Sequence, residues 1–255
     1  MSVSVVLPVR NKVTTVARAV FSAAKQNPAE LVVIDDASDD GTSEILGQLQ
    51  AQLPCVRWIR HAQKSADWQQ AAAEVYGSLV GTHTICMGGD DALTDGVIDS
   101  VARHPTAAVV FHDYWVAGTD DVITGAVTNG YQDTAVFGPE DMLARIRTYP
   151  YASETGIGSG IRTDLLRWLA DREFWRMGPW SDAIGYCTVA ALHGCVFVPG
   201  AGAVFTINPA GYGASGRDGA DAGKYHAAIR DFLGAVDLPP DVRQLMCLKR
   251  QVPCG

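Results

Sequence analysis

The apolar residues of the chain form two alternating kinds of segment, short continuous runs and longer stretches with helical spacing. The short runs in the first third are rich in β-branched residues and predict buried strands. They lie at residues 3–9, 30–36, 56–61 and 82–88. The stretches with helical spacing lie at residues 12–26, 42–53 and 68–80. Strands that alternate with helices over short connections indicate a parallel sheet covered by helices on both faces.

The pattern is less regular after residue 91. Apolar runs predict strands at residues 107–116, 195–199 and 202–207. Helical spacing predicts helices at residues 96–103, 139–147, 162–170, 181–194, 224–236 and 241–250. Residues 209–223 are rich in glycine and small side chains, a composition that fits a mobile loop beside a site and equally a flexible connection. With no internal repeat and no interdomain linker, the chain is predicted to form one domain over residues 1–235 and a helical tail over 236–255.

Composition limits the classes of partner. The chain has 255 residues, of which 47% are hydrophobic and 19% charged, and this length fits one large α/β domain or two small ones. Its formal net charge of −8 argues against nucleic acid or an anionic membrane as the main partner. A small polyanionic ligand remains compatible with this charge, provided that a cation accompanies it.

The cysteines and the N-terminus indicate a cytoplasmic protein. The six cysteines are scattered, without a CxxC pair or zinc-finger spacing, and we interpret them as reduced thiols. The N-terminus enters an apolar run without a basic region or a cleavage site, so no signal peptide is expected. No stretch approaches the ~20 apolar residues of a membrane span.

Acidic residues gather where the predicted strands end. Asp35 and Asp36 end the second strand, Asp90 and Asp91 follow the fourth, and residues 8–11 end the first. Because ligands of open parallel sheets bind beyond the carboxyl ends of the strands, these segments are expected to converge on one edge. Several carboxylates at one edge need a counter-cation, and oxygen ligands suit Mg²⁺ or Mn²⁺. The sequence therefore indicates a nucleoside diphosphate bridged to the protein by a divalent metal.

Two segments carry a resemblance to a known family. "VSVVLPVRNKVTTVARAVFSAAKQNPAELVVIDDASDDGT" (3–42) closely resembles the opening of family-2 glycosyltransferases of the GT-A fold, and "GTHTICMGGDDAL" (81–93) is similar to their DxD metal segment. The resemblance covers roughly residues 3–210. It implies a Rossmann-like, mostly parallel α/β sheet with helices on both faces and a smaller, mixed acceptor-side half. Residues 1–92 would then bind a nucleotide-sugar, residues 93–208 would bind the acceptor, and residues 209–223 would form a flexible loop.

The resemblance also implies site residues on the donor side. The nucleoside pocket would be lined by Pro8, Val9, Arg10 and Asn11. Asp36 would bind the edge of the base, Asp90 would contact ribose and metal, and Asp91 would bind the metal. Asn208 lies where the family often has a metal-assisting histidine, and Gly88 replaces the first acid of the DxD motif. The expected metal site therefore has fewer acidic ligands than the family usually provides.

The acceptor side is similar to the family in "GPWSDAIGYCTVAALHGCVFVPGAGAVFTI" (178–207). There Asp182 matches the catalytic base, although an Asp at this place is also a natural N-cap of the following helix. Trp180 adjoins Asp182 and is expected to stack on an acceptor sugar. His112 and Asp113 at a strand end are expected to be structural, with contact to acceptor or metal as the alternative.

The resulting hypothesis is an inverting transfer of a sugar from a nucleoside diphosphate to an acceptor hydroxyl, assisted by Mg²⁺ or Mn²⁺. The family's commonest donors are UDP-sugars, so a UDP-sugar is the expected donor. The acceptor would be a glycan, a lipid-linked glycan or a protein, and the expected setting is the synthesis of a bacterial surface polysaccharide or another glycan. A membrane-bound acceptor would require peripheral docking at the inner face. Two alternatives stay open: a degenerate transferase that binds nucleotide without turnover, and a nucleotidyltransferase. The latter would need a glycine-rich loop after the first strand, where the chain has "PVRNKVTT".

Overall fold

The computed structural model describes residues 1–65, 68–149, 156–208 and 222–248 of the chain. In this part of the chain one mixed sheet runs through the molecule, with its strands in the order β3-β2-β1-β4-β9-β6-β10-β5. Two further strands lie off this path, since β7 pairs with β6 and β8 pairs with β10. Strands β1 to β4 are parallel to one another, as are β6 and β10. The predicted α/β class with a mostly parallel sheet is confirmed.

The first half follows the predicted alternation of strands and helices. Its elements are β1 (Val3–Val9), α1 (Val16–Ala24), β2 (Glu30–Asp35), α2 (Thr42–Gln52), β3 (Val56–Arg60), α3 (Trp68–Tyr76) and β4 (His83–Cys86). The first helix begins four residues later than the apolar pattern suggested. Lys12 to Thr15 form a turn instead, in which the Lys12 carbonyl accepts the Thr15 and Val16 amides.

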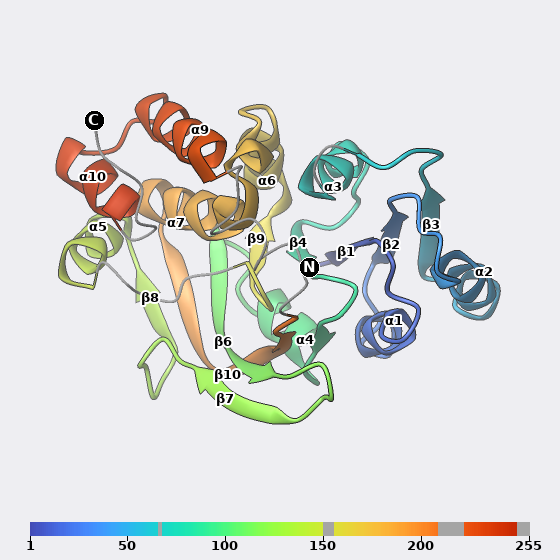
Figure 1. Ribbon diagram of the computed structural model, residues 1–255. Helices are drawn as coiled ribbons and strands as arrows, with labels where there is room; N and C mark the ends of the chain where they lie inside the picture. The colour runs from blue at the N-terminus through green and yellow to red at the C-terminus, as the bar shows by residue number, and fades with distance from the viewer. Residues whose placement is uncertain (66–67, 150–155, 209–221, 249–255) are drawn as a thin grey trace.

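The second half combines strands of very different length with helices on both faces of the sheet: α4 packs on one face, and α5, α6, α7, α9 and α10 pack on the other (Figure 1). In chain order these are β5 (Ala92–Leu93), α4 (Val97–Ala102), β6 (Val109–Ala117), β7 (Ile123–Val127), β8 (Ala135–Phe137), α5 (Pro139–Thr148), β9 (Gly160–Arg162), α6 (Thr163–Ala170), η1 (Phe174–Trp180), α7 (Ser181–His193), β10 (Cys195–Thr206), α9 (Ala222–Gly234) and α10 (Pro240–Leu248). The predicted loop at 209–223 lies almost wholly outside the described residues.

Two sequence-based expectations for the second half were wrong. The strands expected at 195–199 and 202–207 are one strand, β10, which continues through a bulge at residues 199–202. There Asp113 stabilises the bulge, because its Oδ2 accepts the Gly200 amide at 3.0 Å. The strands β5, β7, β8 and β9 were not predicted, because runs of two to five residues are too short to show a period.

Alternate side chains of each strand pack on opposite faces of the sheet. Val5 and Leu7 of β1 belong to a cluster with α1, α2 and α4, whereas Val6 belongs to a cluster with α3, α5, α6, α7, α9 and α10. The latter cluster also contains Val242 and Met246 of α10. The tail predicted at 236–255 therefore contributes buried side chains to the core wherever it is described. None of the five described cysteines forms a disulfide.

The ends of three parallel strands bring the predicted site segments to one edge of the sheet. Val9 at the end of β1 pairs with Asp35 at the end of β2. Strand β4 ends earlier along the sheet, since its last residue, Cys86, pairs with Val6 of β1. The shorter β4 leaves room at this edge for the segment 87–91. The convergence predicted from the sequence is therefore present.

His112 on β6 is a buried histidine whose ring nitrogen Nε2 lies 2.9 Å from the Ser100 Oγ. Burial lowers its pKa from the ordinary 6.5 to about 4. In the unfolded chain the residue takes up its proton near pH 6.5, whereas the folded protein resists it down to about pH 4. The free energy of unfolding should therefore fall as pH decreases from 7 to 4, by about 3 kcal/mol from this residue.

Urea denaturation of wild type and His112→Gln at pH 7, 5.5 and 4.5 measures this contribution as the difference between them, because other titrating groups are common to both. His112→Gln should be less stable than wild type at pH 7, and this difference should shrink between pH 6.5 and 4.5. An unchanged slope in this variant would contradict the assignment of this pH dependence to His112.

Candidate functional site

The segments after β1, β2 and β4 are joined by hydrogen bonds at the sheet edge. The Asn11 amide donates to the Ser38 Oγ at 3.0 Å, and the Asp39 amide donates to the Asn11 Oδ1 at 3.0 Å. On the other side, the Thr15 Oγ1 donates to the Gly89 carbonyl at 2.9 Å. These bonds connect residues that are far apart in the sequence and fix the three segments relative to one another.

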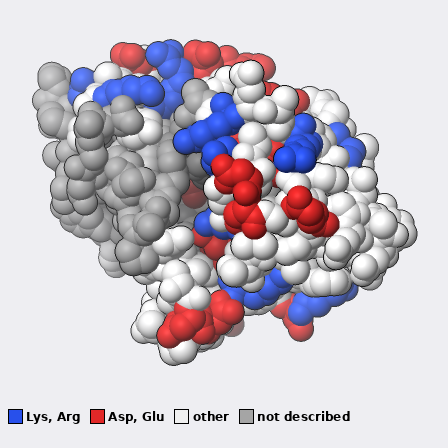
Figure 2. Space-filling model, turned by 45° about the vertical axis from the view of Figure 1, so that its right-hand side comes forward, with Lys and Arg blue, Asp and Glu red and all other residues white. Residues whose placement is uncertain are grey.

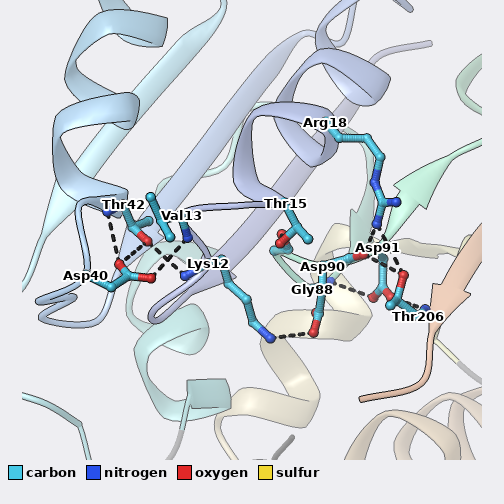
Figure 3. Close-up of polar contacts among 11 residues, drawn as sticks. Lys12, Val13, Thr15, Arg18, Asp40, Thr42, Gly88, Asp90, Asp91 and Thr206 are labelled. Carbon is cyan, nitrogen blue, oxygen red and sulfur yellow. Dashed lines mark hydrogen bonds and ion pairs between the residues drawn. The ribbon is translucent and has the colours of Figure 1, made fainter. Parts of the chain in front are cut away.

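Two aspartates of the "DDASDDGT" segment are structural. Asp35 is buried and accepts the Ser38 amide at 3.0 Å and the Ser43 hydroxyl. Asp40 accepts the Thr42 amide at 3.0 Å and the Val13 amide at 3.1 Å (Figure 3). The segment thereby shapes its own turn and anchors the loop that follows β1.

Asp36 is the aspartate predicted to bind the base, and polar groups surround it. It is 2% exposed, and its Oδ1 accepts the Ser65 amide at 2.7 Å. The same oxygen lies 3.3 Å from the His61 Nδ1, while the other ring nitrogen of His61 lies 3.4 Å from Glu74 Oε2. His61 and Ser65, which the sequence did not single out, therefore orient this carboxylate.

The other residues predicted for the nucleoside pocket lie at the end of β1 and just beyond it. Pro8 and Val9 are buried in the sheet. The Arg10 Nη1 donates to the Asp36 carbonyl at 2.7 Å and to the Ala37 carbonyl at 3.0 Å. Arg10 therefore holds the turn after β2, and contact between these residues and a nucleoside stays a prediction.

Asp90 forms an ion pair with Lys12 across the sheet edge (Figure 3). The Lys12 Nζ contacts the Asp90 Oδ2, and both side chains are 21% exposed. The backbone of Lys12 is also anchored, since its amide donates to the Thr42 Oγ1 at 2.8 Å. No sequence pattern singles out Lys12 beyond its place in the turn after β1.

Asp91 is buried and supports the backbone of its own loop. It is 5% exposed, and its two oxygens accept the Gly88 amide at 3.1 Å and the Thr206 amide at 3.0 Å. Burial, together with the negative charge of Asp90, raises the pKa of Asp91 to about 7. Asp91 thus links the loop after β4 to the end of β10, and its predicted contact with a metal stays a prediction.

Arg18 and Thr206 fix the Asp90 backbone from the two halves of the molecule. The Arg18 guanidinium donates to the Asp90 carbonyl and, at 3.2 Å, to the Thr206 hydroxyl. The same carbonyl accepts the Thr206 hydroxyl at 2.7 Å. Arg18 also forms an ion pair with Asp121 beyond β6. These contacts span nearly 190 positions of the sequence, and no local pattern indicates them.

A divalent metal fits this loop only as a weakly chelated ion. Across the described ranges, no three His, Cys, Asp or Glu side chains are grouped to hold a metal. A Cβ on Gly88 would lie 2.9 Å from the Asp91 Oδ2 and 3.0 Å from the Asp90 Oδ1, so a further acid there would require these carboxylates to shift. Magnesium commonly uses one or two carboxylates and completes its shell with water and phosphate oxygens. Asp90 therefore fits such an ion, and the predicted role of Asn208 stays a prediction.

Asp182 lies in the first turn of α7, and its side chain contacts a different segment. Its Oδ2 accepts the Gly156 amide at 3.1 Å. The N-cap position of α7 is Trp180, which makes no side-chain capping bond, and the Ser181 hydroxyl donates to the Gly178 carbonyl at 2.7 Å. The helix-cap interpretation of Asp182 is therefore not supported by its contacts.

The charge of Asp182 acts on Cys86, the last residue of β4. Desolvation raises the pKa of Cys86 to about 11, and the negative charge of Asp182 adds to this rise. The Tyr76 hydroxyl lies 3.7 Å from the Cys86 Sγ in the same cluster. Cys86 leads directly from β4 into the loop that carries Asp90.

Trp180 is packed inside the protein. It is 7% exposed, and its ring lies 6.2 Å from the Tyr225 ring and 5.7 Å from the His226 ring, centroid to centroid. These contacts with α9 account for the tryptophan through packing. Its predicted contact with an acceptor sugar stays a prediction.

Comparison with known families and sequences gives one match. The model of the family described as Glycosyl transferase family 2 matches residues 4–168. No curated protein matches the chain significantly in sequence.

Solved structures with a similar fold include a mannosyltransferase. Residues 1–349 of TarS from S. aureus match with a TM-score of 0.71 and 18% identity, over 98% of this chain and 72% of that one. In complex with UDP-GlcNAc, the same part of TarS gives a TM-score of 0.73 and 18% identity, over 98% and 71%. The mannosyltransferase PcManGT from Pyrobaculum calidifontis, in complex with GDP-Man and Mn²⁺, gives 0.62 and 14%, over 98% and 69%. The chain spans 43% of a longer TarS chain. At these identities the likeness establishes the GT-A fold.

Proposed function

The chain belongs to glycosyl transferase family 2, and from this premise we propose that it transfers a sugar from a nucleoside diphosphate donor to an acceptor hydroxyl with inversion at the anomeric carbon. The observation that carries the proposal is the convergence of three loops at one sheet edge. That edge brings together Asp36, Asp90 and Lys12, and Asp182 lies within electrostatic reach of the strand that leads into it.

In the proposed mechanism Asp182 is the general base. Its Oδ2 is oriented by the Gly156 amide, and its carboxylate takes the proton of the acceptor hydroxyl as that oxygen attacks the anomeric carbon. The bond between this carbon and the diphosphate oxygen breaks, and the bonding pair leaves with the nucleoside diphosphate. Holding donor and acceptor in line contributes much of the remaining rate acceleration.

The donor half supplies recognition and charge. Asp36, oriented by Ser65 and His61, accepts a hydrogen bond from the edge of the base. Mg²⁺ or Mn²⁺ held by Asp90, with Asp91 and Asn208 nearby in the predicted set, would neutralise the charge of the departing diphosphate. TarS binds UDP-GlcNAc and PcManGT binds GDP-Man with Mn²⁺. We propose a UDP-sugar as donor and surface polysaccharide or glycan synthesis as the setting.

The acceptor is proposed to be a glycan, a lipid-linked glycan or a protein. Within the described parts of the chain, every helix is too short or too polar to cross a bilayer. For a lipid-linked acceptor, we propose that this domain contacts the inner face of the membrane.

The second candidate is a nucleotide-binding module without turnover. Gly88, in place of an acid, favours it, because the carboxylates at this loop are few and one of them is committed to backbone amides. This candidate predicts tight nucleotide binding together with an absence of both transfer and donor hydrolysis.

Thermal unfolding with UDP, GDP, CDP and dTDP, each with EDTA, Mg²⁺ or Mn²⁺, tests the donor site. A ligand at about a hundredfold its dissociation constant adds roughly 2.7 kcal/mol to the free energy of unfolding. We expect one nucleotide to raise the melting temperature by several degrees and Asp36→Ala to remove most of this shift. If none of the four nucleotides stabilises the protein, the proposed donor site is wrong.

A further inference from the structure

We propose that Lys12 is a built-in counter-cation of the diphosphate site, whose ammonium bridges Asp90 and a phosphate and makes nucleotide binding largely independent of added metal. This inference rests on the proposed function. It assigns to one side chain of the chain part of the role that the family resemblance gives to a divalent ion.

Lys12 is held in place at three points. Its amide binds the Thr42 Oγ1 at 2.8 Å, the next amide binds Asp40 at 3.1 Å, and its ammonium pairs with Asp90. The aliphatic part of the side chain passes close to Gly89, where a Cβ would lie 3.1 Å from the Lys12 Cγ. A Cβ at this glycine would also lie 2.6 Å from the Val9 Cγ1, so the glycine lets both side chains pack here. Figure 3 shows the Lys12 side chain reaching Asp90.

The ion pair lies in a partly desolvated position. Both side chains are 21% exposed, so the attraction between them is less screened than at the open surface. An ammonium has three N–H donors. Lys12 can thus keep its bond to Asp90 and donate to a phosphate oxygen at the same time, which is the bridging arrangement that a metal would provide.

The neighbouring guanidinium groups already bind backbone and side-chain oxygens. Arg10 donates to the carbonyls of residues 36 and 37, and Arg18 binds the Asp90 carbonyl, Thr206 and Asp121. The face in Figure 2 carries basic and acidic side chains beside one another and not a continuous basic patch. Lys12 differs from the two arginines because its ammonium pairs with the carboxylate expected to hold the metal.

The carboxylates of this loop are too few to bind a divalent ion strongly while Lys12 keeps its ion pair with Asp90. Both oxygens of Asp91 accept backbone amides, and a Cβ at Gly88 would meet the two carboxylates. A divalent ion must therefore share Asp90 with Lys12 or displace it. Lys12 and the metal should compete for the same carboxylate.

Calorimetric titration of the nucleotide that stabilises the protein best, in EDTA and in excess Mg²⁺, tests the proposal. Lys12→Met keeps the aliphatic chain and removes the charge, and Lys25→Met is the matched control, since Lys25 pairs with the exposed Asp95 on another surface. We expect wild type and Lys25→Met to bind in EDTA within about tenfold of their affinity in Mg²⁺. In EDTA, Lys12→Met should bind about tenfold to a hundredfold more weakly, and Mg²⁺ should restore its affinity.

A second measurement needs no nucleotide. Mn²⁺ binding to the protein alone, followed by electron paramagnetic resonance, should be tighter in Lys12→Met because Asp90 is freed. Equal nucleotide affinity of Lys12→Met and wild type in EDTA would overturn the inference, as would a wild type that binds only with metal. Absence of binding in every condition would instead overturn the proposed function.

Discussion

Asp182→Asn is expected to lower kcat for sugar transfer by about 10²- to 10⁴-fold and to leave nucleotide affinity and stability close to those of wild type. The amide is nearly isosteric with the carboxylate and can still accept the Gly156 amide that orients Oδ2. It cannot take a proton from the acceptor hydroxyl. The loss should therefore appear in kcat and not in the dissociation constant of the donor nucleotide.

The same substitution separates catalysis from helix capping. Asn caps helices about as well as Asp, so a purely structural Asp182 would tolerate this change in both stability and turnover. Asp241→Asn is a matched control, because Asp241 also lies in the first turn of its helix, where it pairs with Arg147 on the surface. Full activity of Asp182→Asn would exclude the residue as the base, whether or not the melting temperature changes.

The donor half could be predicted from the sequence because its signals are local. Each of its strands is a short apolar run beside a helix, and the aspartates at the strand ends fall on one edge once the sheet is parallel. The chain segment "DDASDDGT" also contains its own turn, in which Asp40 binds Thr42 two residues away. Local sequence therefore determines both the loop and its place at the site.

The different partners of the Asp90 and Asp91 carboxylates could not be predicted from local sequence. Asp90 and Asp91 are adjacent in the sequence, yet one pairs with Lys12 and the other binds backbone amides of residues 88 and 206. These partners come from other loops and from β10, so their roles depend on tertiary packing. The family resemblance placed both acids at a metal, and only the contacts distinguish them.

The acceptor side was harder to predict for a similar reason. Short strands such as β9 gain their stability from pairing with β4 and β6, not from a pattern of their own. The Gly156 amide that binds Asp182 belongs to the segment just before β9, and no spacing links these two residues. Sequence could identify a candidate base, but not the group that orients it.

That segment leads to the second large expected effect, a loss of stability in Gly158→Ala of roughly 2–5 kcal/mol. Gly158 has a φ of +62°, a left-handed conformation that disfavours residues with a Cβ. An added Cβ would lie 2.7 Å from the backbone carbon of Gly202 and 2.9 Å from the Ala203 Cβ. Both the backbone and its contact with β10 would therefore oppose the substitution, and the melting temperature should fall by several degrees.

Gly200→Ala is a control that separates the cost of the left-handed backbone conformation from the cost of the steric contact with β10. Gly200 has a φ of +94°, but an added Cβ would meet nothing within 4 Å, so this variant should lose only about 1–2 kcal/mol. Thermal and urea unfolding of both variants measure the difference. Equal losses would mean that the 156–160 segment moves away from β10 without cost.

Gly158→Ala should also reduce turnover, because its turn positions Asp182. The Ser159 amide donates to the Gly156 carbonyl at 3.1 Å, which closes the turn, and the Gly156 amide holds the Asp182 Oδ2. A displaced turn would misplace the carboxylate relative to the acceptor hydroxyl while the donor loops stay intact. At a temperature where the variant remains folded, kcat should fall while nucleotide affinity is unchanged. If kcat is retained, the hydrogen bond from Gly156 is not needed to position the base, and the orientation of Asp182 must come from α7 itself.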